Sequence, residues 1–113
     1  MKHKMKLKDK PFNSIKNGTK TIELRLYDEK RRLLKEHDII EFTNMVTGET
    51  LLVKVLELCI YDNFEELFKR FDKESMGFDE NEEVDPKIME QYYSIEEQEK
   101  YRVVAIKIKK IDK

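Results

Sequence analysis

The sequence predicts an α+β fold that is mainly β: a small barrel or curled sheet of about five strands with flanking helices. Five segments have the alternating or continuous apolar patterns that are typical of strands. Helical patterns gather in two places instead of separating every pair of strands, which favours a mostly antiparallel sheet over a βαβ repeat. The 113 residues, 39% hydrophobic and 10% aromatic, are enough for one core, so we expect a single domain over residues 1–113.

The first 60 residues predict four of the strands and one short helix. Residues 1–8 alternate lysines with the side chains of His3, Met5 and Leu7, as a strand with one buried face does. Pro11 suits the first turn of a short helix, which Gly18 ends. Three more strands are expected, and they cover residues 20–27, 39–43 and 51–60.

The connections between these strands are also visible in the sequence. Residues 28–35 are highly charged and predict a helical turn or loop with Leu33 and Leu34 as its only apolar anchor. Asp38 closes a turn, and residues 47–49 are typical of a hairpin turn. The imperfect alternation of the strand at residues 51–60 predicts a bulge or burial on both faces.

Helical patterns dominate the second half of the chain. Asp62 and Glu65 have the spacing of a capping box, ahead of apolar side chains at helical spacing: Phe64, Leu67, Phe68 and Phe71. Residues 76–85 are acidic and predict a mobile loop, in which the acidic run at residues 79–85 is expected to be solvated. Asp85 and Pro86 start another helical segment, which carries Ile88, Met89 and Tyr92. Ser94 and Glu97 form a second capping box, and residues 102–111 are the last strand, with Val104, Ile106 and Ile108 on one face.

Several classes of site lack their residues here. No CxxC pair occurs and His3 and His37 lie far apart in the chain, so no metal site and no cofactor are expected. The three glycines form neither a phosphate-binding loop nor a dinucleotide fingerprint. Cys59, the single cysteine, lies in an apolar run, which favours packing and a reducing cytoplasm as the location. No apolar run approaches the ~20 residues of a membrane span.

The net charge of −1 conceals an uneven distribution of charge. Residues 1–35 contain 12 basic and 4 acidic residues, and residues 101–113 contain 5 and 1. Residues 61–100 contain 5 basic and 14 acidic residues. If the two basic ends lie side by side, they form a positive surface suited to phosphate; alternatively, the lysines decorate exposed strand faces and blunt sheet edges. The sequence leaves both interpretations open.

The strand at residues 20–27 combines an apolar face with a charged one. Lys20, Glu23 and Arg25 cluster there, and the last two project from the same face because they are two residues apart. An arginine held by a neighbouring carboxylate is a pre-organised fork for a phosphate or a base edge. The alternative is a surface ion pair that contributes well under ~1 kcal/mol.

The motif G-T-K-T-I-E-L-R over residues 18–25, preceded by P-F-N-S-I-K-N, resembles the signature of the ASCH domain family, part of the PUA-like superfamily. His37-Asp38 resembles a turn where the family more often has Gly-Asp, and residues 93–108 resemble the closing segment of small bacterial and archaeal members. The resemblance spans essentially the whole chain. It implies a PUA-like β-barrel with helices around a cleft that binds RNA or a nucleotide.

The resemblance also implies which residues bind the ligand. The Lys, Glu and Arg of the motif correspond to Lys20, Glu23 and Arg25, and we include Thr21 and Tyr27 from the same strand as ligand-binding candidates. Base stacking on Tyr27, or on Tyr92 or Tyr93, is a further expectation.

One branch of the family resembles this chain and removes acyl groups from modified cytidine with a Lys, a Thr and a Glu. Its Lys matches Lys20, but its Thr falls on Glu23, so the nucleophile of that branch is missing at this position. Thr21 lies nearby, and Glu74 lies in the region where the branch keeps its Glu. If the protein is an enzyme, Lys20 and Glu23 are therefore the catalytic candidates, with Glu74 as an additional one.

Three hypotheses about function follow. The first is a module that binds RNA or a nucleotide in the motif cleft. The second is a hydrolase for an acylated nucleoside or an RNA phosphodiester, with Glu23 as general base; a raised pKa of Glu23 would support it. The third is a protein-interaction module whose acidic middle meets a basic partner of unknown identity. We rank binding first, hydrolysis second and protein interaction third.

Overall fold

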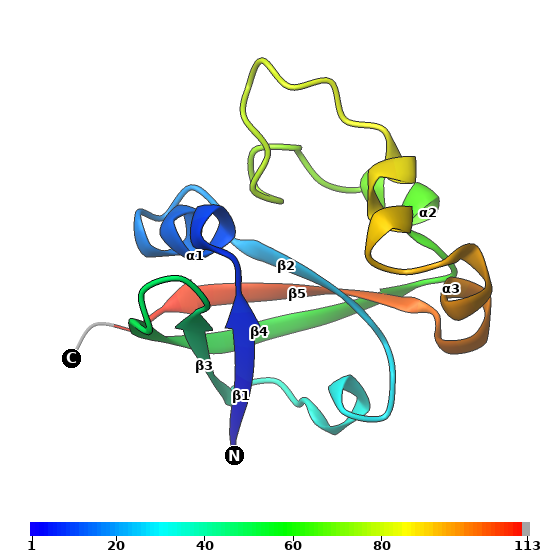
Figure 1. Ribbon diagram of the computed structural model, residues 1–113. Helices are drawn as coiled ribbons and strands as arrows, with labels where there is room; N and C mark the ends of the chain where they lie inside the picture. The colour runs from blue at the N-terminus through cyan, green and yellow to red at the C-terminus, as the bar shows by residue number, and fades with distance from the viewer. Residues whose placement is uncertain (112–113) are drawn as a thin grey trace.

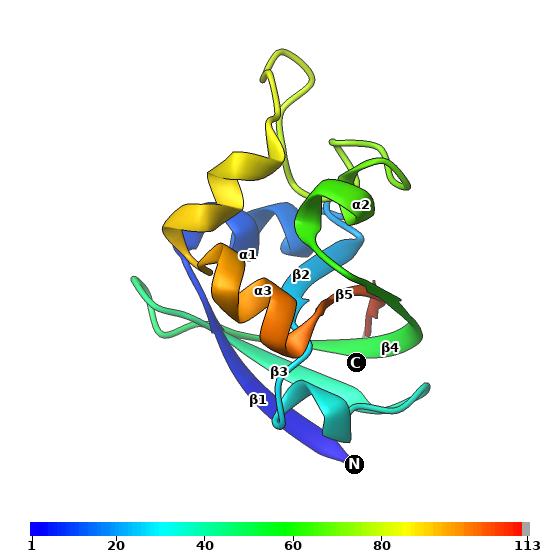
Figure 2. The ribbon, with the colours of Figure 1, turned by 90° about the vertical axis from the view of Figure 1, so that its right-hand side faces the viewer.

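The computed structural model describes residues 1–111, and its central element is one five-stranded sheet. In the order β1–β3–β4–β5–β2, the strands are β1 (Lys2–Leu7), β3 (Ile39–Asn44), β4 (Thr50–Tyr61), β5 (Val103–Lys110) and β2 (Ile22–Leu26). β1 pairs with β3 in parallel, and the other three pairs are antiparallel. The sheet curls into a half-barrel with β1 and β2 as its two edges (Figures 1 and 2). The predicted fold class is confirmed.

The helices gather mostly on one side of this sheet. They are α1 (Asp9–Lys16), α2 (Phe64–Phe68), the 3₁₀ helix η2 (Pro86–Gln91) and α3 (Ile95–Tyr101), while the 3₁₀ helix η1 (Arg31–Leu33) lies at the other side (Figures 1 and 2). The segment between α2 and η2 reaches back to the start of β2, where the carbonyl of Ser75 accepts from the backbone N–H groups of Thr21 and Ile22. No helix within residues 1–111 combines the length and the apolar character needed to cross a membrane.

Strand β5 is buried on both faces, and this divides the core into two clusters. Val104, Ile106 and Ile108 pack on one face with apolar side chains of β1, β3, β4 and α1. Val103 and Ala105 pack on the other face with side chains of β2, α2 and η2. The predicted irregularity of the long fourth strand is confirmed, because its register against β5 shifts between Val55 and Glu57.

The start of α2 differs from the prediction by one residue. Asn63, not Asp62, is the N-cap, and its side chain accepts from the backbone N–H of Glu66 at 2.9 Å. Both residue types cap helices well, so the buried Phe64 fixes the start of the helix at the following position. The helix ends at Phe68, which leaves Phe71 beyond it, in edge-on contact with Tyr61.

The structure agrees to different degrees with the predicted second capping box, the charged turn and the acidic run. The capping box of Ser94 and Glu97 is confirmed. In the charged turn, Leu34 is buried whereas Leu33 is 62% exposed, so only one of the two leucines anchors the segment. Residues 79–85, the acidic run expected to be solvated, are exposed except for Glu82 and Val84, which are half-buried.

The two basic ends of the chain are neighbours at one place, because β2 of residues 1–35 pairs with β5 of residues 101–113. β3 and β4 separate β1 from β5 in the sheet. Lys2 pairs with Glu41 of β3 at 3.2 Å and Lys107 pairs with Glu57 of β4 at 3.0 Å, as lysines on exposed strand faces do. The two ends also meet where Lys110 Nζ donates to the carbonyl of Lys16 at 2.9 Å, while the lysines that line a cleft beside β2 come from residues 1–35.

Candidate functional site

The charged face of β2 points into the half-barrel. Ile22, Leu24 and Leu26 face the second core cluster, so the alternation of a strand turns Glu23 and Arg25 to the opposite side. This side of β2 faces the inside of the curled sheet, so it is shielded from solvent. Glu23 is only 4% exposed.

Glu23 is held by two cations, one on each carboxylate oxygen. Lys20 Nζ lies 3.3 Å from Oε1, and Arg25 Nε donates to Oε2 at 2.7 Å. Lys20 is itself buried, and its Nζ donates to the carbonyl of Met76 at 2.8 Å. Arg25 Nη2 donates to the carbonyl of Lys6 at 2.9 Å, so this side chain connects the edge strands β1 and β2. We call Lys20, Glu23 and Arg25 the buried cluster.

The two cations keep Glu23 ionised. Burial by itself would raise the pKa of this carboxyl, but the charges of Lys20 and Arg25 outweigh burial and hold the pKa below its ordinary value. Burial would lower the pKa of Arg25, and Glu23 more than offsets this effect. The cluster therefore carries a fixed net positive charge.

A cleft of about 420 Å³ opens beside the buried cluster. Its basic side consists of the end of β1 and the start of α1, with Lys6, Lys8 and Lys10. The cleft is also lined by residues of η2, by the two tyrosines that follow η2, and by residues 76–78 and Glu82. This volume lies within the range of small-molecule sites, ~300–1,000 Å³.

Apolar side chains gather at the mouth of this cleft. Met45, Ile88 and Tyr92 are among the most exposed large hydrophobic residues, and all three line it. Tyr93 also lines the cleft, and its ring stacks on the ring of buried Phe64 at 5.8 Å. Burial raises the pKa of the Tyr93 phenol, an effect that Arg25 opposes, so the phenol stays protonated. The cleft thus combines cationic and aromatic side chains, which meet where Lys8 Nζ lies 4.8 Å from the centroid of the Tyr92 ring.

Gly77 lets the chain approach Lys20 closely. Its φ of +98° lies in the left-handed region that favours glycine. A Cβ at this position would lie 2.9 Å from Lys20 Cδ. The segment at Met76 and Gly77 is therefore packed directly on the lysine that contacts Glu23.

The structure separates the other predicted site residues from the cleft. Thr21 is exposed just before β2 and does not line the cleft. Tyr27 is half-buried with the guanidinium of Arg32 4.4 Å above its ring, also outside the cleft. Glu74 is exposed and lies outside it too.

The two histidines do not meet. His3 is buried in β1 with Nε2 2.8 Å from Asp38 Oδ2, while His37 is exposed in the neighbouring turn. Within residues 1–111, no group of three or more histidine, cysteine or carboxylate side chains is arranged to hold a metal ion.

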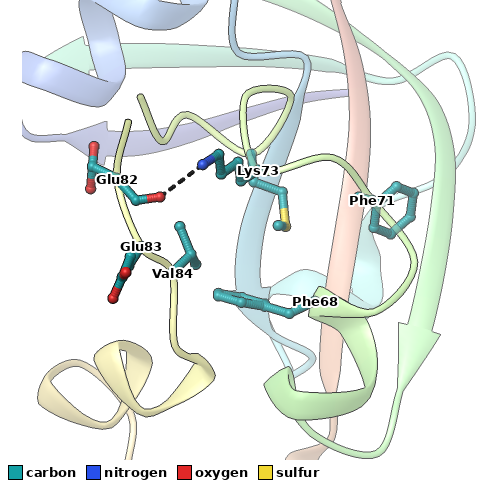
Figure 3. Close-up of a pocket in the computed structure, with 7 residues that line it drawn as sticks. Phe68, Phe71, Lys73, Glu82, Glu83 and Val84 are labelled. Atoms are coloured by element: carbon teal, nitrogen blue, oxygen red, sulfur yellow. Dashed lines mark hydrogen bonds between the residues drawn. The ribbon is translucent and has the colours of Figure 1, made fainter. Parts of the chain in front are cut away.

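A second hollow of about 520 Å³ lies behind residues 82–84 (Figure 3). Phe68 and Phe71 form one side, and Glu82, Glu83 and Val84 form the other. Lys73 lies between them and donates from Nζ to the backbone carbonyl of Glu82 at 2.9 Å. Glu82 borders both this hollow and the cleft.

Sequence reasoning missed the contacts that the loop makes with the cleft. The carbonyl of Met76 and the close approach of Gly77 come from a segment more than 50 residues away from Lys20. The only available signal was a single glycine in an acidic segment, which predicts a turn and names no partner.

Comparisons with known proteins identify the family and the fold. The model of the family described as "ASCH domain" matches residues 5–112. The crystal structure of the hypothetical protein PH0355 is 42% identical, with a TM-score of 0.83 over 98% of this chain and all of that one. The solution structure of protein PF0455 from Pyrococcus furiosus is 32% identical, with a TM-score of 0.74 over the whole of both chains. No curated protein matches the chain.

Proposed function

The chain belongs to the ASCH domain family, and we propose that it binds RNA or a nucleotide in the cleft beside Lys20, Glu23 and Arg25. The observation that carries this proposal is the arrangement of the buried cluster. Glu23 fixes an arginine and a lysine at the wall of a cleft large enough for a small ligand. Side chains held in this way lose little conformational entropy when a ligand binds.

The cationic side chains are suited to a phosphate. Two of the five N–H groups of Arg25 are used by Glu23 and Lys6, which leaves three for an anion. Lys6 and Lys8 are exposed and line the same cleft. Guanidinium and ammonium groups are the usual partners of phosphate oxygens.

The aromatic side chains are suited to a base. Tyr92 and Tyr93 line the cleft with Met89 and Ile88, and Lys8 Nζ lies 4.8 Å from the centroid of the Tyr92 ring. Bases stack on aromatic side chains, and such contacts contribute ~1–3 kcal/mol per base. A ligand that has both a planar base and a phosphate is a nucleotide.

Hydrolysis has less support from this geometry. An efficient general base has a pKa near the working pH, whereas the pKa of Glu23 is lowered and both of its oxygens are occupied. Thr21 and Glu74, the other candidates from the resemblance, do not line the cleft. The proposal is therefore binding without a chemical step.

Two lysines of the N-terminal segment provide a matched test. Lys8 lines the cleft, where its Nζ donates to the hydroxyl of Tyr92 at 3.5 Å, whereas Lys4 is also exposed and does not line it. Fluorescence anisotropy with a labelled nucleotide and a short labelled RNA should show that Lys8→Gln lowers affinity several-fold and reduces the salt slope by about one. Lys4→Gln should leave both unchanged. Equal behaviour of the two variants, or binding that is insensitive to Arg25→Ala, contradicts the proposal.

A further inference from the structure

Residues 79–83, which we call the acidic loop, border the cleft through Glu82. The loop carries four carboxylates: Asp79, Glu80, Glu82 and Glu83. Glu82 and Asp79 reach across to α1, where Lys10 Nζ lies 2.9 Å from Glu82 Oε1 and 3.5 Å from Asp79 Oδ2. One of the three lysines on the basic side is thus already occupied by carboxylates of the same chain.

Glu82 is fixed in this position from three directions. The backbone N–H of Asp79 donates to its Oε1 at 2.9 Å, Lys10 contacts the same oxygen, and Lys73 donates to its carbonyl oxygen. The hydrogen bond from Asp79 N–H and that from Lys10 lower the pKa of Glu82, so it stays ionised at neutral pH. A negative charge is therefore held at the border of a basic cleft.

The base of the acidic loop is anchored to the buried cluster. Met76 accepts from Lys20, and Gly77 packs against the same side chain. The loop is therefore held at the cleft, although the hollow behind Glu82 and Val84 leaves it without close packing on its far side (Figure 3).

This arrangement should bind a single phosphate more favourably than a chain of phosphates. A single phosphate can lie on the basic side, near Lys6, Lys8 and Arg25. A continuous strand that left the cleft at the loop would bring its next phosphates toward the carboxylates of Glu82 and Asp79, where like charges repel. Grooves that bind single strands instead follow the backbone with continuous positive charge over ~4–16 nucleotides.

We propose that the acidic loop makes the cleft selective for a single nucleotide over a continuous strand, with Asp79 and Glu82 as the residues that determine this specificity. The inference rests on the proposed function and narrows its ligand class. The cleft volume of about 420 Å³, near the lower end of small-ligand sites, agrees with one nucleotide-sized ligand.

The test compares two probes and two double variants. The probes are a labelled nucleoside monophosphate and a labelled eight-nucleotide single-stranded RNA, both at low and at physiological salt. Asp79→Asn with Glu82→Gln removes two charges from the acidic loop and releases Lys10. Glu29→Gln with Glu36→Gln makes the same change in charge at exposed residues outside the cleft.

We expect wild type to prefer the monophosphate, and the loop variant to bind the eight-nucleotide RNA about tenfold more tightly at low salt, with less effect on the monophosphate. The control variant should leave both affinities unchanged. If wild type binds both probes equally, or if both double variants strengthen RNA binding alike, the inference is overturned while the proposed function stands. If Arg25→Ala leaves binding of the monophosphate intact, the proposed function itself fails.

Discussion

Two groups of charges border the same cleft, and they differ in almost every physical respect. In the buried cluster, the side chains of Lys20, Glu23 and Arg25 are 6%, 5% and 13% exposed. In the pair of Lys10 with Glu82 they are 59% and 33% exposed. Glu23 and Arg25 of the first group lie on β2, whereas in the second group Lys10 lies on α1 and Glu82 on the acidic loop. The side chains of the first group are shielded from water, so they hold one another in a fixed arrangement. The exposed pair can separate, and Lys10 can then contact a ligand.

The two groups should also differ in how much they contribute to the stability of the fold. Removing one member of a buried ion group leaves the others uncompensated in a medium of low dielectric, which is strongly destabilising. An exposed pair is screened by water and salt and contributes little. The comparison therefore predicts a large effect of substitution on stability at the buried cluster and a small effect at Lys10.

The largest effect is expected for Glu23→Ala. This change leaves Lys20 and Arg25 buried without their shared carboxylate, and we expect it to lower the free energy of unfolding by ~3–5 kcal/mol. Urea denaturation followed by circular dichroism measures the change. Glu96→Ala, at an exposed position of α3, is the control and should stay within ~0.5 kcal/mol of wild type. A loss at Glu23 no larger than that of the control would show that burial does not distinguish the two groups.

The next effect concerns the contact that connects the loop to the buried cluster. Gly77→Ala places a side chain at φ +98° and 2.9 Å from a lysine that is itself pinned by Met76 and Glu23. We expect a loss of ~1–3 kcal/mol, of which ~1–2 comes from the backbone conformation alone.

Gly18→Ala separates the two contributions, because Gly18 has φ +89° and open space around its Cβ position. Its loss in urea denaturation should reflect the backbone term only. Gly77→Ala should also weaken nucleotide binding, whereas Gly18→Ala should not. Equal losses in the two variants would mean that the packing on Lys20 adds nothing.

Asp38 is a third charged site, and its contribution to stability should depend on pH. Asp38 accepts hydrogen bonds from His3 and from the backbone N–H of Lys35, and these lower the pKa of Asp38 from 3.8 to about 2, with the bond to His3 contributing most. Because the folded-state pKa is the lower one, this stabilisation is present above about pH 4 and is lost as pH falls toward 2.

Melting temperatures of wild type and Asp38→Asn between pH 2 and pH 7 test this sign. The variant should be less stable at neutral pH, and the difference should narrow below about pH 4. A difference that widens as the pH falls would contradict the hydrogen-bonded arrangement. Glu23, whose pKa is also lowered, remains in both proteins, so its own loss in acid is common to the two curves.

The sequence predicts the sheet well, because alternation reports directly which face of a strand is buried. The burial pattern of β1, with His3, Met5 and Leu7 inside, follows the predicted alternation residue by residue. Helix starts are less certain, since Asp62 and Asn63 cap equally well and only the burial of Phe64 decides between them.

The site is predictable only in part. Spacing places Glu23 and Arg25 on one face, and the resemblance to ASCH domains adds Lys20, but neither gives their burial, which depends on the curl of the sheet. The contacts of Met76 and Gly77 with Lys20 join distant segments and carry no local pattern. At His37 the structure explains a feature of the sequence pattern. Its φ of +75° lies in the left-handed region that favours glycine, and glycine is the residue that the resemblance to the family expects at this place in the turn.

The smallest effect on stability is expected at the exposed pair. Lys10→Gln removes the ammonium that contacts Glu82 and Asp79, yet water and salt already screen these charges. The midpoint of urea denaturation should therefore shift only slightly at low salt and not measurably at physiological salt. Lys87→Gln, at an exposed lysine outside the cleft, controls for the change in net charge. If Lys10→Gln destabilised the protein as much as Glu23→Ala, the acidic loop would be part of the fold's rigid framework. Lys10 could not then exchange its contact with the loop for a ligand phosphate, and the division between fixed and exchangeable charges at this cleft would fail.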